Sequence, residues 1–201
     1  MVRFVPPSQA SQVERKLTEW LHQDVQKIEV LMAVKKLTDA HQNLGSFFVA
    51  AGFLRNMYWD QVHAFPSTPL ADIDVVYFHK QHPDKAQDEM LEQALTQHLP
   101  SIPWSVKNQA RMHTKSGHVP YISLEDALSN WVETATAIGV RVADNHRLEF
   151  IAPWGYQDLV DLVLRPTPFF EQQLTVFEER IQSKKWLEKW PKLKVVWPNS
   201  P

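Results

Sequence analysis

Two aspartates separated by one residue, Asp72 and Asp74, are the side chains in this sequence best suited to chemistry. They lead into an apolar run that predicts a buried strand over 72–78. Alternate strand residues point to the same face, so the two carboxylates would lie roughly 7 Å apart along the strand at Cα. That spacing lets their oxygens converge on one or two divalent ions. A shared proton, a basic partner or a metal would offset the repulsion between the two carboxylates. An acidic turn that opens a strand is the alternative interpretation.

A glycine-led helix start precedes this pair. The apolar run 46–51 predicts a buried strand, Gly52 interrupts it, and 53–63 has close to helical apolar spacing. Glycine permits a ligand to approach the backbone closely, and N–H groups at the helix start can hold a phosphate. Arg55 and Asn56 lie in the first turn, where they add hydrogen-bond donors. The alternatives are an ordinary strand-to-helix turn and, for Arg55, a solvated charge.

A third chemical feature is a short polar and basic segment at the end of the strand predicted over 104–109. It contains Lys107, Asn108, Arg111 and His113. Charge-assisted donors of this kind would neutralise a triphosphate. A charge cluster at the edge of a sheet is the alternative, and His113 is equally consistent with a structural histidine.

Five segments in order carry a resemblance to a known family: AGFLRNMYWDQVH, DIDVVYF, SVKNQARMH, ETATAIGVR and APWGYQDL. They resemble a bacterial nucleotidyltransferase-like family, formerly of unknown function, in the polymerase-beta-type nucleotidyltransferase superfamily. The spacing of GFLRN and DIDVV is also distantly similar to the start of the tRNA CCA-adding enzymes. The resemblance implies an α+β fold with a mixed sheet of about five strands packed with helices. It further implies catalytic, metal-binding roles for Asp72 and Asp74, Mg²⁺ or Mn²⁺ as cofactor, and a nucleoside triphosphate as substrate.

The chain departs from the superfamily pattern at the third strand. That strand often supplies a third carboxylate, which completes metal coordination or takes the proton of the attacking hydroxyl. Here the strand offers Lys107 or Asn108 instead. Either another carboxylate substitutes, or the site binds nucleotide and metal with little turnover. The candidates to substitute are Asp158, Asp126 and Glu133.

The elements around these residues predict one nucleotidyltransferase-like domain over 1–201. We expect a loose lead-in over 1–10, a helical cover over 10–43, a core over 45–165 and a C-terminal helix over 168–190. Within the core, Trp154 and Tyr156 would either stack on a base or pack in the core. The other expected elements are helices over 84–99 and about 124–132, a hairpin of 134–142 with 148–152, and a tail after 191 that docks or stays loose.

Composition narrows the classes of function. The 201 residues carry a formal charge of −2, which gives no argument for wholesale nucleic-acid or membrane binding. No cysteine is present, so disulfides, thiolate metal sites and thiol catalysis are excluded. No apolar signal segment or membrane-length run is visible, so we expect a cytoplasmic protein.

Three functional hypotheses remain open from the sequence. The first is a metal-dependent enzyme that transfers a nucleoside monophosphate from a triphosphate to an acceptor that nothing in the sequence specifies. The second is a catalytically weak or inactive nucleotide- or metal-binding protein of the same fold. The third is an interaction protein that uses some of its eight tryptophans as a partner surface. CCA addition itself is not expected, because the chain is too short for all the modules of those enzymes.

Overall fold

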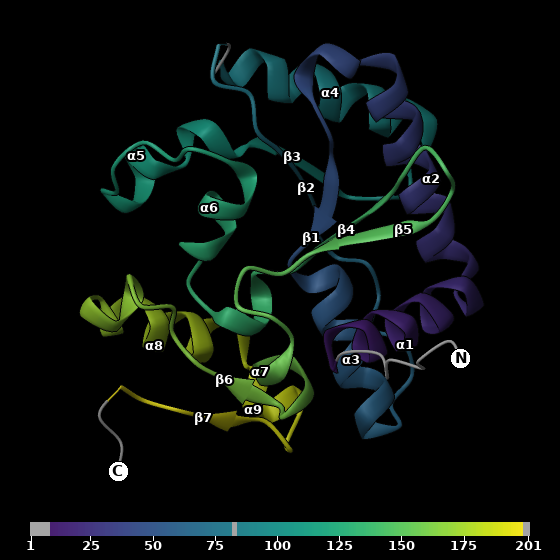
Figure 1. The fold of residues 1–201 in the computed structure, drawn as a ribbon. Helices are drawn as coiled ribbons and strands as arrows, with labels where there is room; N and C mark the ends of the chain where they lie inside the picture. The colour runs from purple at the N-terminus through teal and green to yellow at the C-terminus, as the bar shows by residue number, and fades with distance from the viewer. Residues whose placement is uncertain (1–8, 82–83, 199–201) are drawn as a thin grey trace, which may run out of the picture.

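A five-stranded mixed sheet packed with helices forms the centre of the computed structural model, which describes residues 9–81 and 84–198 (Figure 1). The strand order is β3-β2-β1-β4-β5; β2 and β3 are parallel, and the other neighbours are antiparallel. The predicted α+β class and mixed five-stranded sheet are therefore confirmed. The strands are β1 (Phe48–Ala50), β2 (Ile73–Tyr77), β3 (Trp104–Asn108), β4 (Gly139–Val142) and β5 (Leu148–Ile151).

Helices α2 (Val25–Ala40) and α4 (Lys85–His98) pack on one face of this sheet, and α1 (Gln9–Gln23) packs against α2 (Figure 1). Asp24 and Asp84 cap the starts of α2 and α4 by accepting backbone N–H groups. Alternation along β2 sends every second side chain into this apolar core, because successive strand residues point to opposite faces. Buried core residues of the covered face include Leu31, Val49, Val75, Leu91 and Val106.

The opposite face of the sheet is less fully covered. A small apolar cluster of Ala50, Val76 and Leu128 lies there, between the strands and helix α6 (Leu124–Ser129). Asp74 is two residues before Val76 on β2, so it points to this same face. Figure 1 shows α5 (His113–Ser116) and α6 on this side of the sheet, away from α2 and α4. The acidic pair therefore faces the side of the sheet where space for a ligand exists.

Helix α3 (Gly52–His63) begins directly after β1, with the unusual backbone at Ala51 rather than at the glycine. Ala51 has φ +56° and ψ −121°, a region that costs energy for a residue with a side chain. The start of α3 and the loop before β2 line the same cavity. Such strain at a residue that lines a cavity is typical of functional sites.

The C-terminal region differs from the single helix expected over 168–190. That prediction is wrong: the chain forms η4 (Phe170–Gln172), α8 (Leu174–Lys184) and α9 (Trp186–Lys189), with a break at Lys185. Lys185 adopts φ +50°, a left-handed conformation that ends α8. The turn lets Trp186 pack edge-on against Trp59, with ring centroids 6.0 Å apart. Tertiary packing thus overrides the helical spacing of the sequence.

The tail docks as a strand: β7 (Lys194–Val195) pairs in parallel with β6 (Val163–Leu164) in a second, two-stranded sheet. The segment 134–136, expected as strand, is a 3-10 turn ahead of β4. Residues 1–8 of the expected lead-in lie outside the described residues. Along the described chain, no helix is long and apolar enough to cross a membrane. The remaining short elements are η1 (Gln42–Leu44), η2 (Gln109–Arg111), η3 (Thr134–Thr136) and α7 (Gln157–Val160).

Candidate active site

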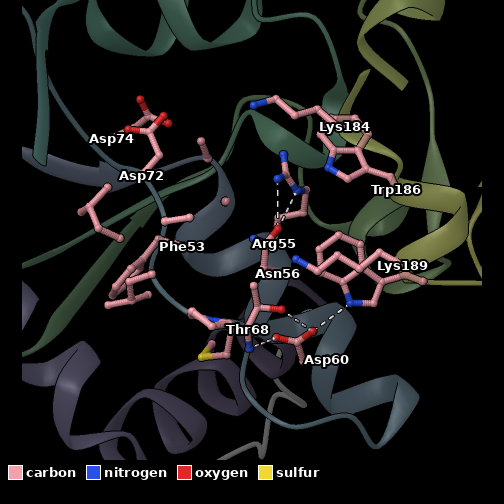
Figure 2. Close-up of a pocket in the computed structure, with 18 of the residues that line it drawn as sticks. Phe53, Arg55, Asn56, Asp60, Thr68, Asp72, Asp74, Lys184, Trp186 and Lys189 are labelled. Atoms are coloured by element: carbon pink, nitrogen blue, oxygen red, sulfur yellow. Dashed lines mark hydrogen bonds between the residues drawn. The ribbon is translucent and has the colours of Figure 1, made fainter. Parts of the chain in front are cut away.

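The start of α3 and the start of β2 form two walls of one cavity of about 200 Å³, here called the first cavity (Figure 2). Gly52, Arg55 and Asn56 line it from the helix, and Asp72 and Asp74 line it from the strand. The structure therefore brings five of the residues singled out in the sequence into one place.

The acidic pair carries an electrostatic cost. Asp72 is exposed and Asp74 is half-buried. Burial raises the pKa of Asp74 to about 6, and the neighbouring charge of Asp72 adds to the shift. Arg180, Arg55 and Lys107 act in the opposite direction. A bound cation would relieve this repulsion, because it favours the ionised form of both carboxylates.

The donor set fits a metal that is shared with a phosphate ligand. Among residues 9–81 and 84–198, no three His, Asp or Glu side chains come together as a metal-binding group. Mg²⁺ commonly takes only one or two protein carboxylates and fills its other positions with water and substrate phosphate oxygens. Asp72 and Asp74 therefore suit an ion that keeps water and phosphate ligands, and not an ion whose ligands all come from the protein.

Arg55 is a buried cation held in a fixed position. Its Nη1 donates to Thr136 Oγ1 at 2.8 Å, its Nη2 donates to Asn56 Oδ1 at 3.0 Å, and its guanidinium lies 4.5 Å from the ring centroid of Trp186. Burial lowers the pKa of Arg55 to about 10, so the side chain stays positively charged at neutral pH. A charge kept in place at this cost is suited to an anionic ligand.

Helix α8 contributes two basic residues that sequence reasoning missed, Arg180 and Lys184. Both line the first cavity, and their spacing of one helical turn places them on the same face of the helix. Figure 2 shows Lys184 reaching across the pocket toward the side of Asp72 and Asp74. Within the described residues, Lys184 Nζ makes no hydrogen bond or ion pair. The spacing is visible in the sequence, but the apolar periodicity of this segment indicates only the side of the helix that packs in the core.

A second cavity of about 440 Å³ adjoins the first. Both are lined by Ala51, Asp72, Asp74, Arg180 and Lys184, so they meet at the acidic pair. The remaining lining of the second cavity includes aromatic and amide side chains, the predicted residue Lys107 and a further lysine, Lys115.

Glu133 is the one candidate third carboxylate that lines either cavity. Its side chain is fully buried, and its Oε1 lies 2.6 Å from Arg180 Nε. The contact is an ion pair without hydrogen-bond alignment, so both oxygens lack a hydrogen-bond donor. Asp158 instead accepts from Thr134 Oγ1 at 2.7 Å and pairs with Arg165.

The last candidate carboxylate, Asp126, accepts from the backbone N–H of Ile122 at 2.8 Å. Neither Asp126 nor Asp158 lines a cavity that contains Asp72 and Asp74. The structure thus leaves the acidic pair without a third carboxylate beside it among the described residues.

Asn108, Arg111 and His113 lie apart from both cavities. Asn108 is fully buried and joins the ends of β2 and β3: its amide accepts from His79 N at 3.0 Å and donates to His79 O at 2.8 Å. Arg111 is ion-paired with the buried Asp88, and His113 packs edge-on against Tyr121. These residues support the sheet from the side of α4 and α5.

Trp154 and Tyr156, the expected base-stacking candidates, also lie elsewhere. Trp154 Nε1 donates to Ser129 O at 3.0 Å, and Tyr156 Oη donates to Glu14 at 2.8 Å. Neither lines the two cavities at the acidic pair. The aromatic side chains that do so in the second cavity are Tyr121, Trp131 and Phe170.

Asp60 is a buried residue of α3 that the sequence pattern did not reveal. It accepts three hydrogen bonds, from Thr68 N at 2.7 Å, Thr68 Oγ1 at 2.9 Å and Trp190 Nε1 at 2.8 Å (Figure 2). Ser67, the residue before Thr68, accepts a hydrogen bond from Lys27 Nζ at 3.0 Å. These bonds hold the loop that leads into Asp72.

The fold and the paired aspartates define a polymerase-beta-like nucleotidyltransferase, distantly like the CCA-adding enzymes. A family model described as "Nucleotidyltransferase" matches residues 38–195, and the chain belongs to that family. This confirms the resemblance found in the sequence. A comparison with curated proteins finds no match.

Solved structures agree with this assignment. A protein whose NMR structure is described as revealing a CCA-adding enzyme head domain is 28% identical, with a TM-score of 0.77 over 92% of this chain and 96% of that one. The Thermotoga maritima CCA-adding enzyme complexed with tRNA_CCA is 16% identical, with a TM-score of 0.60. A CCA-adding enzyme in complex with ATP is 15% identical, also with a TM-score of 0.60. The chain covers 90% of its own length in these two matches, but only 42% and 43% of the enzymes.

Proposed function

We propose that this protein transfers a nucleoside monophosphate from a nucleoside triphosphate to an acceptor, with Mg²⁺ or Mn²⁺ held by Asp72 and Asp74. The observation that carries the proposal is the first cavity, where the acidic pair faces a helix N-terminus and several cations. Structures of similar fold are described with CTP and with ATP, which supports a triphosphate as the ligand.

The triphosphate would lie against the N-terminus of α3. Unpaired backbone N–H groups and the helix dipole favour anions there. Arg55 supplies a fixed positive charge from the same helix, and Arg180 and Lys184 supply charges from α8. Charge-assisted hydrogen bonds from such groups are stronger than neutral ones, particularly in a partly desolvated cavity.

The reaction is a substitution at the α-phosphorus. The nucleophilic atom of the acceptor loses its proton to solvent and forms a bond to this phosphorus, while the bond to the bridging oxygen of the β-phosphate breaks and pyrophosphate leaves. When bound, the divalent ion neutralises developing charge and orients the phosphate oxygens. Arg55, Arg180 and Lys184 would stabilise the charge that accumulates on the pyrophosphate.

A nucleotide- and metal-binding protein with little turnover is the second candidate. It is favoured by the absence of a third carboxylate beside the acidic pair in the described residues. On β3, the residue level with Val76 is Lys107, which contributes a cation to the second cavity instead of a metal ligand or base.

Pyrophosphate release separates these candidates without knowledge of the acceptor. The protein is incubated with each [α-³²P]-labelled nucleoside triphosphate, Mg²⁺ and a bacterial extract divided into RNA, protein and small-molecule fractions. Transfer predicts labelled product and pyrophosphate from the wild type. The Asp72→Asn/Asp74→Asn variant should lose on the order of a hundredfold or more of this activity. The control is Asp144→Asn, which changes an exposed carboxylate.

Two other outcomes would count against this proposal. Mg²⁺-dependent nucleotide binding without pyrophosphate release in any fraction would support the binding protein over the enzyme. Equal pyrophosphate release by wild type and double variant would contradict the roles given to the two aspartates.

A further inference from the structure

We propose that the second cavity binds the nucleoside part of the triphosphate, with the base stacked against Tyr121, Trp131 and Phe170. This inference rests on the proposed function and names a subsite within it. The α-phosphate would then lie at Asp72 and Asp74, where the two cavities meet, with the β- and γ-phosphates in the first cavity.

The two cavities differ in size and lining in the way that the two halves of a nucleotide differ. The first, of about 200 Å³, has α3's N-terminus and Arg55 on its wall. The second, of about 440 Å³, holds three aromatic rings next to Lys107 and Lys115. The first also has aromatic side chains on its wall, but Trp186 already packs on the Arg55 guanidinium and Trp190 packs on Trp59. A polyanion suits the first environment, and a planar base suits the second.

The three rings come from separate segments and are held in place. Tyr121 and Phe170 are buried, and Trp131 is half-buried. Trp131 Nε1 donates to Gln109 Oε1 at 3.2 Å, and Tyr121 Oη lies 3.2 Å from Ser116 Oγ. A ring that is already fixed loses little conformational entropy when a base stacks on it. Stacking on an aromatic side chain contributes on the order of tenfold in affinity.

Polar groups at the same cavity can meet the edges of a nucleoside. Gln109 and Asn130 both line it with amide side chains. Glu133 also lines it, fully buried: its Oε1 is ion-paired with Arg180, and its Oε2 has no hydrogen-bond donor. Buried oxygens in this state have capacity to accept from a hydroxyl or amino group of a ligand.

Inorganic tripolyphosphate provides the discriminating probe, because it keeps the polyanion and lacks the nucleoside. Isothermal titration calorimetry with Mg²⁺ should show ATP or CTP binding the wild type at least about tenfold more tightly than tripolyphosphate. Trp131→Leu should lose most of the difference in affinity between nucleotide and tripolyphosphate, and it should leave the Kd of tripolyphosphate unchanged. Trp131→Phe keeps an aromatic ring and should retain most of the difference.

Two control variants separate the subsites. Trp197→Leu removes an exposed tryptophan that lines neither cavity and should change no Kd. Lys184→Ala should weaken the binding of ATP and of tripolyphosphate by similar factors, because Lys184 would contact the phosphates. Circular dichroism checks the fold of each variant, and Phe170→Leu replaces Trp131→Leu if the latter does not fold.

The inference is overturned if Trp131→Leu and Phe170→Leu, both folded, leave ATP and CTP affinity unchanged. It is also overturned if these two variants lose as much affinity for tripolyphosphate as for the nucleotides, or if the wild type binds no nucleotide. The proposed function fails separately, through normal pyrophosphate release by the Asp72→Asn/Asp74→Asn variant. If the Asp72→Asn/Asp74→Asn variant loses pyrophosphate release but Trp131→Leu keeps its nucleotide affinity, only the nucleoside subsite is rejected. The second cavity would then be open to the acceptor.

Discussion

At the scale of single residues, the cleft combines charges that are unfavourable without a ligand. Burial and the charge of Asp72 raise the pKa of Asp74 to about 6, while burial lowers the pKa of Arg55 to about 10. Each shift shows that the charged form is disfavoured in the empty cleft. A divalent cation would favour the charged form of Asp74, and a polyphosphate would favour the charged form of Arg55. One metal–nucleotide ligand therefore satisfies both groups.

The raised pKa of Asp74 predicts that Asp74→Asn stabilises the ligand-free protein at pH 7. The wild type must keep a disfavoured charge there, and the neutral amide removes it. We expect the free energy of unfolding to rise by roughly 1–3 kcal/mol, measured by urea denaturation without divalent ions.

This gain should depend on pH in a defined direction. The folded-state pKa of Asp74 lies above its ordinary value of 3.8, so the folded protein binds the proton more tightly. The wild type therefore recovers stability as the pH falls through about 6, and its difference from Asp74→Asn should vanish below about pH 4. A gain that stayed constant from pH 7 to pH 4 would contradict the assigned electrostatic cause.

Gly52 allows the fold and the ligand site to be tested separately. A Cβ at this position would lie 3.4 Å from Arg55 Nη2 and 3.4 Å from Asn56 Nδ2, which is ordinary contact. We therefore expect Gly52→Ala to change the free energy of unfolding by no more than about 1 kcal/mol. The methyl group would occupy space next to the donors, so Mg²⁺-dependent ATP affinity should fall about tenfold by calorimetry. Unchanged ATP affinity would remove the α3 N-terminus from the phosphate site.

The sequence correctly predicted neighbours where the residues lie at the ends of strands that a local hydrophobic pattern reveals. Gly52, Arg55 and Asn56 follow one strand and Asp72 and Asp74 begin the next, and antiparallel pairing of β1 with β2 brings them together. Arg111 was less predictable, because its partner Asp88 comes from helix α4. No local pattern in the sequence shows that such a distant carboxylate pairs with a given arginine.

At the scale of elements, the position of Asp72 depends on contacts from two distant parts of the chain. Asp60 of α3 holds Thr68 in the loop before β2, and Trp190 after α9 donates to the same carboxylate. The C-terminal segment is therefore coupled to the loop that carries Asp72 into the cleft.

This coupling predicts a functional effect for Trp190→Phe. Loss of the indole donor leaves the buried Asp60 with fewer hydrogen bonds, so the free energy of unfolding should fall by about 1–3 kcal/mol. Mg²⁺-dependent ATP affinity should fall severalfold, because the loop before Asp72 loses support and because Trp190 itself lines the first cavity. Trp197→Phe is the matched control on the tail. A loss of stability with unchanged ATP affinity would restrict the Asp60 contacts to a structural role.

The break between α8 and α9 was not predictable from the sequence. The apolar spacing over 168–190 indicates one helix, and a straight helix would not turn Trp186 toward Trp59. The left-handed residue Lys185 is neither glycine nor asparagine, so it gives no sequence signal for a helix end. Packing of the two tryptophans is a long-range effect that periodicity does not contain.

At the scale of the whole molecule, the central sheet was predictable because its strands follow a strong local pattern. Ile73, Val75 and Tyr77 alternate with Asp74 and Val76, which marks one buried face and one face toward the cleft. The pairing of β6 with β7 was not predictable, since each has two residues and no periodicity to detect. The likeness to a CCA-adding enzyme head domain extends over 92% of the chain.

The central claim is that Asp72 and Asp74 bind a divalent ion together with a nucleoside triphosphate. Calorimetric titration of ATP into the protein, with Mg²⁺ and then with EDTA, tests it most directly. We predict binding that requires Mg²⁺ in the wild type and in Asp144→Asn, and that is lost in the folded Asp72→Asn/Asp74→Asn variant. Equal Mg²⁺-dependent ATP binding by the double variant and the wild type would contradict the account.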